Sequence, residues 1–217
     1  MNIQQVAGET LYLLAESAVY WPRKSTLLVA DIHFGKAAAF RAAGIPVPAG
    51  TTAANLAALD SLLHRYAIKE IIFLGDFFHA RTAQASATLS ELQNWRAKYP
   101  LLSMTLVRGN HDKHAGDPPT ALGIQVVDAP YRIDGMALCH HPDPIEGMFV
   151  MAGHIHPVYR LRSGADKVRL PCYVIGPRHM VLPSFGAFTG GFNITAQPGE
   201  RLFVIADETV MALPEQY

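Results

Sequence analysis

Cysteine, net charge and long apolar runs are all scarce in this sequence, and each absence excludes a class of protein. The 217 residues include two cysteines, Cys139 and Cys172. That is too few for a disulfide framework, so we expect a reducing compartment, the cytoplasm. The 18 basic and 18 acidic residues give no formal net charge, which argues against DNA binding through bulk charge but leaves room for a local basic groove.

Targeting and membrane signals are missing as well. No apolar run is long enough to span a bilayer, so a membrane is not an expected partner. The first ten residues lack the basic start and apolar stretch of a secretory signal. Hydrophobic residues make up 50% and charged residues 17% of the chain, which excludes intrinsic disorder. Without repeats or a linker of low complexity, residues 1–217 are expected to form a single domain.

The order of the expected elements indicates an α/β fold. Apolar runs predict strands, and helical spacing of apolar residues predicts helices, the longest with a threonine as its N-cap. Strands are expected at 11–14, 18–20, 26–30, 71–74, 104–107, 136–139 and 148–152, and helices at 34–43, 51–66 and 89–97. From about Tyr159 onward, turn-forming pairs separate short strands: Ser163-Gly164, Gly176-Pro177, Gly190-Gly191 and Pro198-Gly199. A hairpin of 202–206 and 209–213 is expected to close the chain, so mixed sheets with helices outside are predicted.

Polar residues that can bind metal follow five of the apolar runs. Active sites of open α/β sheets lie at the carboxyl ends of strands, and seven of the ten histidines fall in these five places. A single such residue is more often a capped strand end than a ligand, but five together predict an active site. The five segments are Asp31-Ile-His33, Gly75-Asp-Phe-Phe-His79, Gly109-Asn-His-Asp112, His140-His141 and Gly153-His-Ile-His156.

The residue types in these segments indicate which metal is bound. Carboxylates, imidazoles and one carboxamide without clustered thiolates favour Mn²⁺, Fe or Zn²⁺ in an open catalytic site. In Asp31-x-His33 and again in His154-x-His156, alternate residues of an extended segment are expected to point the same way and reach one ion. Glycines that precede Asp76, Asn110 and His154 permit close backbone approach. Paired ions about 3.5–4 Å apart are a device for phosphoester hydrolysis.

The five segments, in this order, resemble the calcineurin-like metallophosphoesterase superfamily from Asp31 to His156. A narrower resemblance is to the ligase-associated DNA damage response endonucleases of bacteria. It is carried by residues 20–22 (YWP), 31–36 (DIHFGK), 40–41 (FR), 44–48 (GIPVP) and 183–188 (PSFGAF). The resemblance implies a four-layer αββα sandwich, in which two mixed β-sheets are flanked by helices.

The resemblance also implies a role for each site residue, with two divalent ions, Mn²⁺ first, as cofactors. One ion is held by Asp31, His33, Asp76 and His156, and the second by Asn110, His140 and His154, with Asp76 as the bridge. His111 is the implied acid that protonates the leaving oxygen, Asp112 orients its imidazole, and His79 contacts the scissile phosphate. His140 is favoured over His141 as the ligand because it directly ends a strand. Lys36, Arg81 and Arg108 are candidates for phosphate binding and equally for ordinary surface cations.

Three functions are compatible with these residues. The first is a nuclease for DNA or another phosphodiester, in a repair context and with a DNA ligase or helicase system as partner. In it, a water or hydroxide held by the metals attacks phosphorus directly and His111 acts as general acid. The second is a small-molecule phosphoesterase for a cyclic nucleotide, a nucleotide diphosphate or a monoester. The third is a non-catalytic scaffold, against which the complete ligand set argues. His79 and residues 34–48 favour the nuclease.

Overall fold

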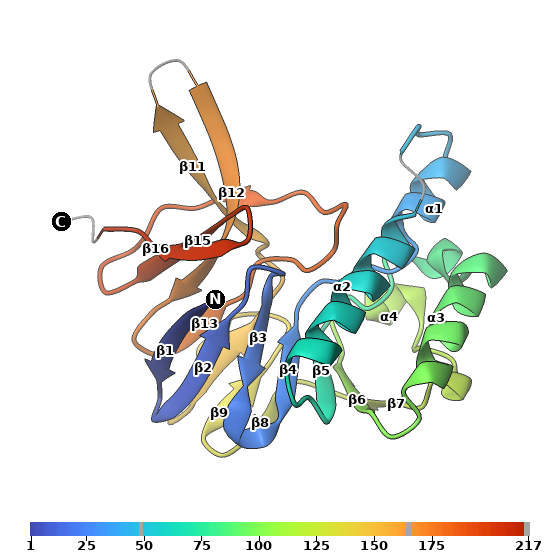
Figure 1. Cartoon of the computed structure of the whole chain (residues 1–217), viewed down its shortest axis with the longest axis horizontal. Coiled ribbons are helices and arrows are strands. Elements are labelled where there is room, and N and C mark those ends of the chain that lie inside the picture. The colour runs from blue at the N-terminus through green and yellow to red at the C-terminus, as the bar shows by residue number, and fades with distance from the viewer. Residues whose placement is uncertain (48–49, 164–165, 215–217) are drawn as a thin grey trace.

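Two β-sheets, packed face to face, form the frame of the molecule (Figure 1). The computed structural model describes residues 1–47, 50–163 and 166–214. Pro48 of the narrower resemblance and Gly164 of the predicted turn therefore lie outside the described residues.

The first sheet contains seven strands that pair in chain order. Its first four strands form an antiparallel meander, and the fourth to seventh are parallel. The strands are β1 (Asn2–Val6), β2 (Glu9–Leu13), β3 (Ala18–Trp21), β4 (Thr26–Val29), β5 (Glu70–Leu74), β6 (Ser103–Val107) and β7 (Ile124–Val127). Because β4, β5 and β6 run in parallel, their carboxyl ends meet at one edge of the sheet.

Helices cover the outer face of this sheet (Figure 1). They are α1 (Lys36–Ala42), α2 (Thr51–Arg65), α3 (Ser86–Lys98) and the single turn α4 (Asp112–Ala115), with 3₁₀ turns η1 (Pro22–Lys24), η2 (Arg81–Gln84) and η3 (Thr120–Leu122). Leu59 of α2 and Trp95 of α3 share one buried cluster with Phe73 of β5. The expected threonine cap of α2 is wrong. The N-cap is Gly50, in a left-handed conformation that glycine adopts without strain, and no side chain caps the helix.

The second sheet contains nine strands in mixed orientation. Its central strands β9, β10 and β13 are parallel, and the outer hairpins are antiparallel. The strands are β8 (Tyr131–Ile133), β9 (Met136–Leu138), β10 (Phe149–Ala152), β11 (Pro157–Ser163), β12 (Asp166–Ile175), β13 (His179–Val181), β14 (Phe192–Asn193), β15 (Arg201–Ala206) and β16 (Thr209–Ala212). The predicted closing hairpin is therefore present as β15 and β16.

The core lies between the two sheets and follows the two-residue period of their strands. In β10, Met151 points into the shared core, while Val150 belongs to a separate cluster on the outer face. That outer face is covered by loops, with Ile145 over β10 and Ile194 over β12. The predicted pair of mixed sheets is confirmed. Among the described residues every helix lies between Pro22 and Leu122, so loops form the fourth layer.

Candidate active site

Five loops bring the predicted site residues to one edge of the sandwich. Asp31 and His33 follow β4, Asp76 follows β5, and Asn110 follows β6. From the second sheet, His140 follows β9, and His154 and His156 follow β10. The side chains predicted from the sequence as metal ligands therefore converge from both sheets on one place.

One group of ligand atoms surrounds Asp31. The ligand atoms of Asp31, His33 and His156 all lie within 4.8 Å of one another. His156 Nε2 is 3.3 Å from Asp31 Oδ1, and His33 Nε2 is 3.9 Å from Asp76 Oδ2. Three of these side chains are buried, and His156 is half-buried. We call these four residues the Asp31 cluster.

A second group surrounds His140. Its Nε2 lies 2.8 Å from Asn110 Oδ1, 3.1 Å from His154 Nδ1 and 3.4 Å from Asp76 Oδ1. We call these four residues the His140 cluster. Asp76 thus belongs to both clusters, with Oδ2 toward His33 and Oδ1 toward His140. This is the position that a bridging carboxylate occupies in a site for two ions.

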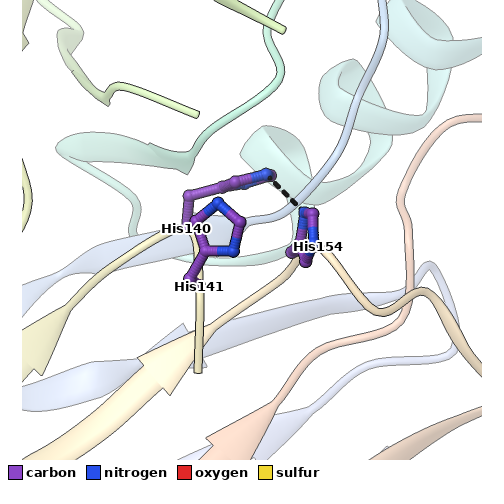
Figure 2. A group of neighbouring side chains, drawn as sticks. All are labelled: His140, His141 and His154. Atoms are coloured by element: carbon purple, nitrogen blue, oxygen red, sulfur yellow. Dashed lines mark hydrogen bonds between the residues drawn. The ribbon is translucent and has the colours of Figure 1, made fainter. Parts of the chain in front are cut away.

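The neighbouring histidines His140 and His141 differ in their surroundings (Figure 2). His140 is 1% exposed, and its Nδ1 lies 3.0 Å from the carbonyl oxygen of Leu74. His141 is exposed, and its ring centroid lies 4.0 Å from that of His154. Donation from Nδ1 to the carbonyl leaves the Nε2 lone pair of His140 toward the cluster, the arrangement usual for a ligating imidazole.

Burial lowers the pKa of most imidazoles at the site, which favours the neutral form that can ligate a metal, whereas at His156 the adjacent Asp31 carboxylate outweighs burial and raises the pKa. Burial, reinforced by the nearby Lys36 ammonium, lowers the pKa of His33 to about 2 and that of His79 to about 4. Burial also lowers the pKa of His140. In the opposite sense, burial raises the pKa of the Asp76 carboxyl, an effect that the adjacent Asp31 reinforces and a hydrogen bond from the His111 backbone N–H opposes.

The donor set fits a pair of divalent cations. Asp31 Oδ1, both ring nitrogens of His33 and Nε2 of His156 are buried without a hydrogen-bond partner among the described residues. Buried carboxylates and orphaned imidazole nitrogens cost free energy unless a cation compensates them. With Nδ1–H of His140 directed at Leu74, the lone pair of its Nε2 faces the oxygen atoms of Asn110 and Asp76, and a cation between these acceptors would compensate them.

Backbone conformation corrects one expectation from the sequence. The φ angles of Asp31, His33, Asp76, His154 and His156 lie between 48° and 67°, in the left-handed region. This conformation is rare for residues other than glycine and costs free energy, and it concentrates at functional sites. The extended geometry expected for Asp31-x-His33 and His154-x-His156 is therefore wrong. His154 and His156 diverge, one into the His140 cluster and the other into the Asp31 cluster.

Close backbone approach, expected of the glycines before three ligands, is confirmed. A Cβ atom on Gly109 would overlap Asp76 Oδ1, and one on Gly153 would overlap Asp31 Oδ2. A Cβ on Gly75 would overlap the ring of His140. Each of these glycines therefore leaves room for a ligand carried by a different loop.

The predicted partnership of Asp112 with His111 is wrong. The Asp112 carboxylate accepts hydrogen bonds from the backbone N–H groups of Asp76, Phe77 and Gly109, at 2.8–2.9 Å. His111 Nδ1 instead lies 2.7 Å from the carbonyl oxygen of His79, and its Nε2 lies 3.9 Å from Asp76 Oδ2. Asp112 is buried among turn amides, where a carboxylate satisfies several donors at once. It holds the loops that carry Asp76 and Asn110.

His79 lies beside both His111 and the Asp31 cluster. Its ring stacks on that of His111 with centroids 5.0 Å apart, and it meets His33 and Phe40 edge-on at 5.5 and 5.4 Å. Its Nδ1 is buried without a partner among the described residues. The predicted contact of His79 with the scissile phosphate remains a prediction.

The three candidate phosphate-binding cations have different surroundings. Lys36, in the first turn of α1, is half-buried, and burial lowers its pKa against the opposing effect of Asp31 and Asp76. Arg81 is exposed in η2. Arg108 does not support the prediction. Its guanidinium donates to Asp117 and Asp128 at 2.7–2.8 Å, so two carboxylates outweigh its charge.

Asn55 was not predicted from the sequence. This buried residue of α2 donates to the carbonyl of Ile32 at 3.0 Å and accepts from the N–H of Ala187 at 2.9 Å. The hydroxyl of Ser184 donates to the carbonyl of Asp31 at 2.8 Å. Together these bonds tie residues 183–188 to the loop that carries Asp31 and His33. The only sign of this role in the sequence was the position of Asn55, a polar residue next to the apolar face of the predicted 51–66 helix.

A hollow of about 440 Å³ opens beside the His140 cluster. Its lining includes Asn110, Lys113, His140, His141 and Asp143. It is large enough for a nucleoside-sized group next to the candidate ligands.

Comparison with known proteins identifies the class to which this site belongs. Residues 24–168 match the family model of the calcineurin-like phosphoesterases. The chain therefore belongs to the calcineurin-like phosphoesterase family, and it is a metal-dependent phosphoester hydrolase. Comparison with curated protein sequences gave no match.

Among solved structures, the chain is similar to nuclease MPE of Pseudomonas putida. The two are 46% identical, the match covers 98% of this chain and 100% of that chain, and the TM-score is 0.87. A protein of unknown function from Aquifex aeolicus, AQ665, is 19% identical over 60% of this chain and 78% of its own, with a TM-score of 0.41. Among the described residues, no helix is long and apolar enough to cross a membrane.

Proposed function

We propose that this protein is a nuclease that hydrolyses phosphodiester bonds of DNA in a repair context, with Mn²⁺ as its preferred ion. The observation that carries the proposal is the pair of clusters that share Asp76, in a chain 46% identical to a nuclease over nearly its whole length. The repair context and a ligase or helicase partner follow from the narrower resemblance of residues 31–48 and 183–188. Location in the cytoplasm is consistent with the free cysteines, Cys139 and Cys172, both buried.

Each cluster would hold one ion. The Asp31 cluster offers two carboxylates and two imidazoles, and the His140 cluster offers Asn110 and two imidazoles with the shared Asp76. When bound, two divalent ions supply Lewis acidity toward the phosphate and lower the pKa of water at the site. Asp31 and Asp76 return two negative charges against four positive ones, so the occupied site attracts a phosphate although the chain has no net charge.

His111 is the residue that we assign to proton delivery. Its Nδ1 is directed at the carbonyl of His79, and its side chain is 37% exposed, with Nε2 on the side of Asp76. This orientation presents Nε2–H to a leaving oxygen, while the His79 carbonyl fixes the ring through Nδ1. His79 stacks on this ring, and we assign it to phosphate contact. Lys36 adds a positive charge on the same side.

A small-molecule phosphoesterase is the second candidate, because the hollow beside the His140 cluster would accept a nucleoside-sized group. The two functions are separated by one panel of substrates, assayed with the purified protein and Mn²⁺. The panel contains single-stranded DNA, double-stranded DNA, bis-p-nitrophenyl phosphate, p-nitrophenyl phosphate and a cyclic nucleotide. The nuclease proposal expects cleavage of DNA and of bis-p-nitrophenyl phosphate, with both activities abolished by EDTA. Rapid turnover of the cyclic nucleotide or the monoester without DNA cleavage would replace it with the second candidate.

A further inference from the structure

The β11–β12 hairpin rises from the second sheet next to the candidate active site, at the end of the molecule where α1 rises from the first (Figure 1). β11 begins at Pro157, the residue after His156. β14 runs parallel beside it, with Phe192 opposite Pro157 and Asn193 opposite Val158. The base of the hairpin is therefore continuous with the Asp31 cluster.

One face of this hairpin gathers positive charge. The register pairs Arg160 with Arg169, and residues directly opposite in an antiparallel pair share a face. Lys167 lies two residues before Arg169 in β12 and therefore on the same face. In the sequence, residues 157–171 contain four basic residues and one acidic residue, Asp166. Like charges directly opposite each other destabilise a strand pair, so the sequence maintains an arrangement that folding alone disfavours. An anionic partner would remove this repulsion.

The outer cations of this face are available to such a partner. Arg160 and Lys167 are exposed, and neither makes a hydrogen bond or an ion pair within the part of the chain that the structure describes. Arg169, in contrast, is engaged within the protein. Its guanidinium donates to the carbonyl of Gly191 and, at 3.3 Å, to Asn193 Oδ1. It thereby fastens the segment next to Gly190.

Gly190 connects this face to the site. Its carbonyl oxygen lies 3.1 Å from Nδ1 of His156. Arg160 follows Pro157 by three residues, which in a strand is about 10 Å. The cations thus begin beside the Asp31 cluster and extend away from it over the length of a few nucleotides. A partner with evenly repeated negative charges matches this spacing better than a single small anion does.

We propose that the cationic face of the β11–β12 hairpin, through Arg160 and Lys167, binds the phosphate backbone of a nucleic-acid strand whose scissile bond lies at the two clusters. This inference rests on the proposed nuclease function and adds the surface that such a substrate needs. A chain without net charge must concentrate its cations locally in order to bind a polyanion. The hairpin supplies that concentration beside the site.

The test compares substrates that reach the hairpin with substrates that do not. Arg160→Gln, Lys167→Gln and the double variant are assayed with Mn²⁺ on a single-stranded 20-mer, a dinucleotide and bis-p-nitrophenyl phosphate. Lys69→Gln is the matched control, because Lys69 is also exposed but precedes β5, at the opposite end of the strand from the site. For the 20-mer, each lost cation is expected to raise KM about fivefold at 0.1 M salt. The slope of log KM against log salt should fall by about 0.7 per cation. The two small substrates should be turned over as by the unaltered protein.

Several results would overturn the inference. If the unaltered protein cleaves the 20-mer and the double variant matches Lys69→Gln, the hairpin does not bind the strand, although the nuclease function stands. Equal losses on bis-p-nitrophenyl phosphate would mean that the substitutions act through His156. If the unaltered protein hydrolyses bis-p-nitrophenyl phosphate but no nucleic acid, the proposed function fails and the inference fails with it. Thermal melting of each variant checks the fold, and Arg160→Lys, which keeps the charge, should retain binding of the 20-mer.

Binding to vesicles of anionic phospholipid is measured for the same variants. If the double variant loses vesicle binding but keeps the KM of the unaltered protein for the 20-mer, the face binds a membrane and the proposal is refuted.

Discussion

His111 is fixed at one ring nitrogen and open at the other. Nδ1 is directed at the His79 carbonyl at 2.7 Å, and the side chain is 37% exposed. If Nε2 delivers the proton, His111→Ala should lower kcat by about 10²–10⁴-fold on a DNA phosphodiester, whose alkoxide is a poor leaving group. The loss should be much smaller on bis-p-nitrophenyl phosphate, because p-nitrophenolate leaves without protonation. The measurement is kcat of the variant on both substrates.

Controls separate proton delivery by His111 from a structural role and from simple phosphate binding. Circular dichroism and metal analysis should show an intact fold and an unchanged ion content, because His111 lies outside both clusters. Equal losses on the two substrates would leave His111 as a residue that only grips the phosphate.

Asp112 anchors the loops that carry Asp76 and Asn110, a structural role that its place beside His111 in the sequence did not indicate. Replacement by asparagine removes the charge from three hydrogen bonds and turns an amide donor toward backbone N–H groups. We expect Asp112→Asn to cost at least about 2 kcal/mol of stability, or a Tm about 4–8 °C lower. Ion content should fall too, because Asp76 and Gly109 lose their anchor. Asp128→Asn, the same change in a side chain that is 82% exposed, should leave Tm nearly unchanged.

A different outcome would restore the role that the sequence suggested. Unchanged Tm and ion content, combined with the leaving-group dependence expected of His111→Ala, would show that Asp112 acts through the imidazole.

At the scale of the elements, the sequence predicts where strands end better than how the chain continues beyond them. Apolar runs place the carboxyl ends of β4, β5, β6, β9 and β10 at one edge, because parallel strands share direction and metal-capable residues follow each run. The left-handed φ angles of Asp31 and His154 were not predictable, because that conformation is imposed by tertiary contacts. Strands β1, β7 and β8 were missed, since all three are short edge strands that carry polar residues and no continuous apolar run.

The glycines that precede the ligands leave no room for a side chain, and this gives a prediction at the scale of the loops. In Gly109→Ala, the new Cβ would meet Asp76 Oδ1 and also the Asp76 backbone nitrogen, which cannot move aside cheaply. The displaced carboxylate should weaken Mn²⁺ affinity by about 10–100-fold. Gly190→Ala is the matched control, because a Cβ there has no atom within 4 Å and the backbone φ is not left-handed. Calorimetric titration measures the Mn²⁺ affinity of both variants. Equal affinities would show that the loop after β6 shifts to accommodate the new Cβ without displacing the Asp76 carboxylate.

At the scale of the whole molecule, the order of the elements predicted mixed sheets with helices outside and the family resemblance implied two packed sheets, while the loop-covered outer face of the second sheet was not foreseen. The sequence after Leu122 carries no helical spacing, and the expectation of helices on both sides came from the family resemblance alone. Short apolar segments such as Ile194 and Ile145 cover that face instead. Such coverage depends on contacts between residues far apart in the chain, which periodicity does not reveal.

The two sheets meet at the candidate metal site, so ion binding should stabilise the whole fold. Asp31 and Asp76 come from the first sheet, and His140 and His156 from the second. An ion bound only by the folded chain stabilises it by about 2.7 kcal/mol at a concentration 100 times its Kd. In a chain of this length, that corresponds to a rise in Tm of about 5–10 °C. We therefore expect Mn²⁺ to raise Tm by this amount, EDTA to reverse the rise, and Asp76→Asn to reduce it more than Asp31→Asn, because Asp76 belongs to both clusters. Differential scanning calorimetry with and without Mn²⁺ measures the shift. An unchanged Tm in a preparation whose activity requires Mn²⁺ would mean that the ions bind with the substrate and do not join the sheets beforehand.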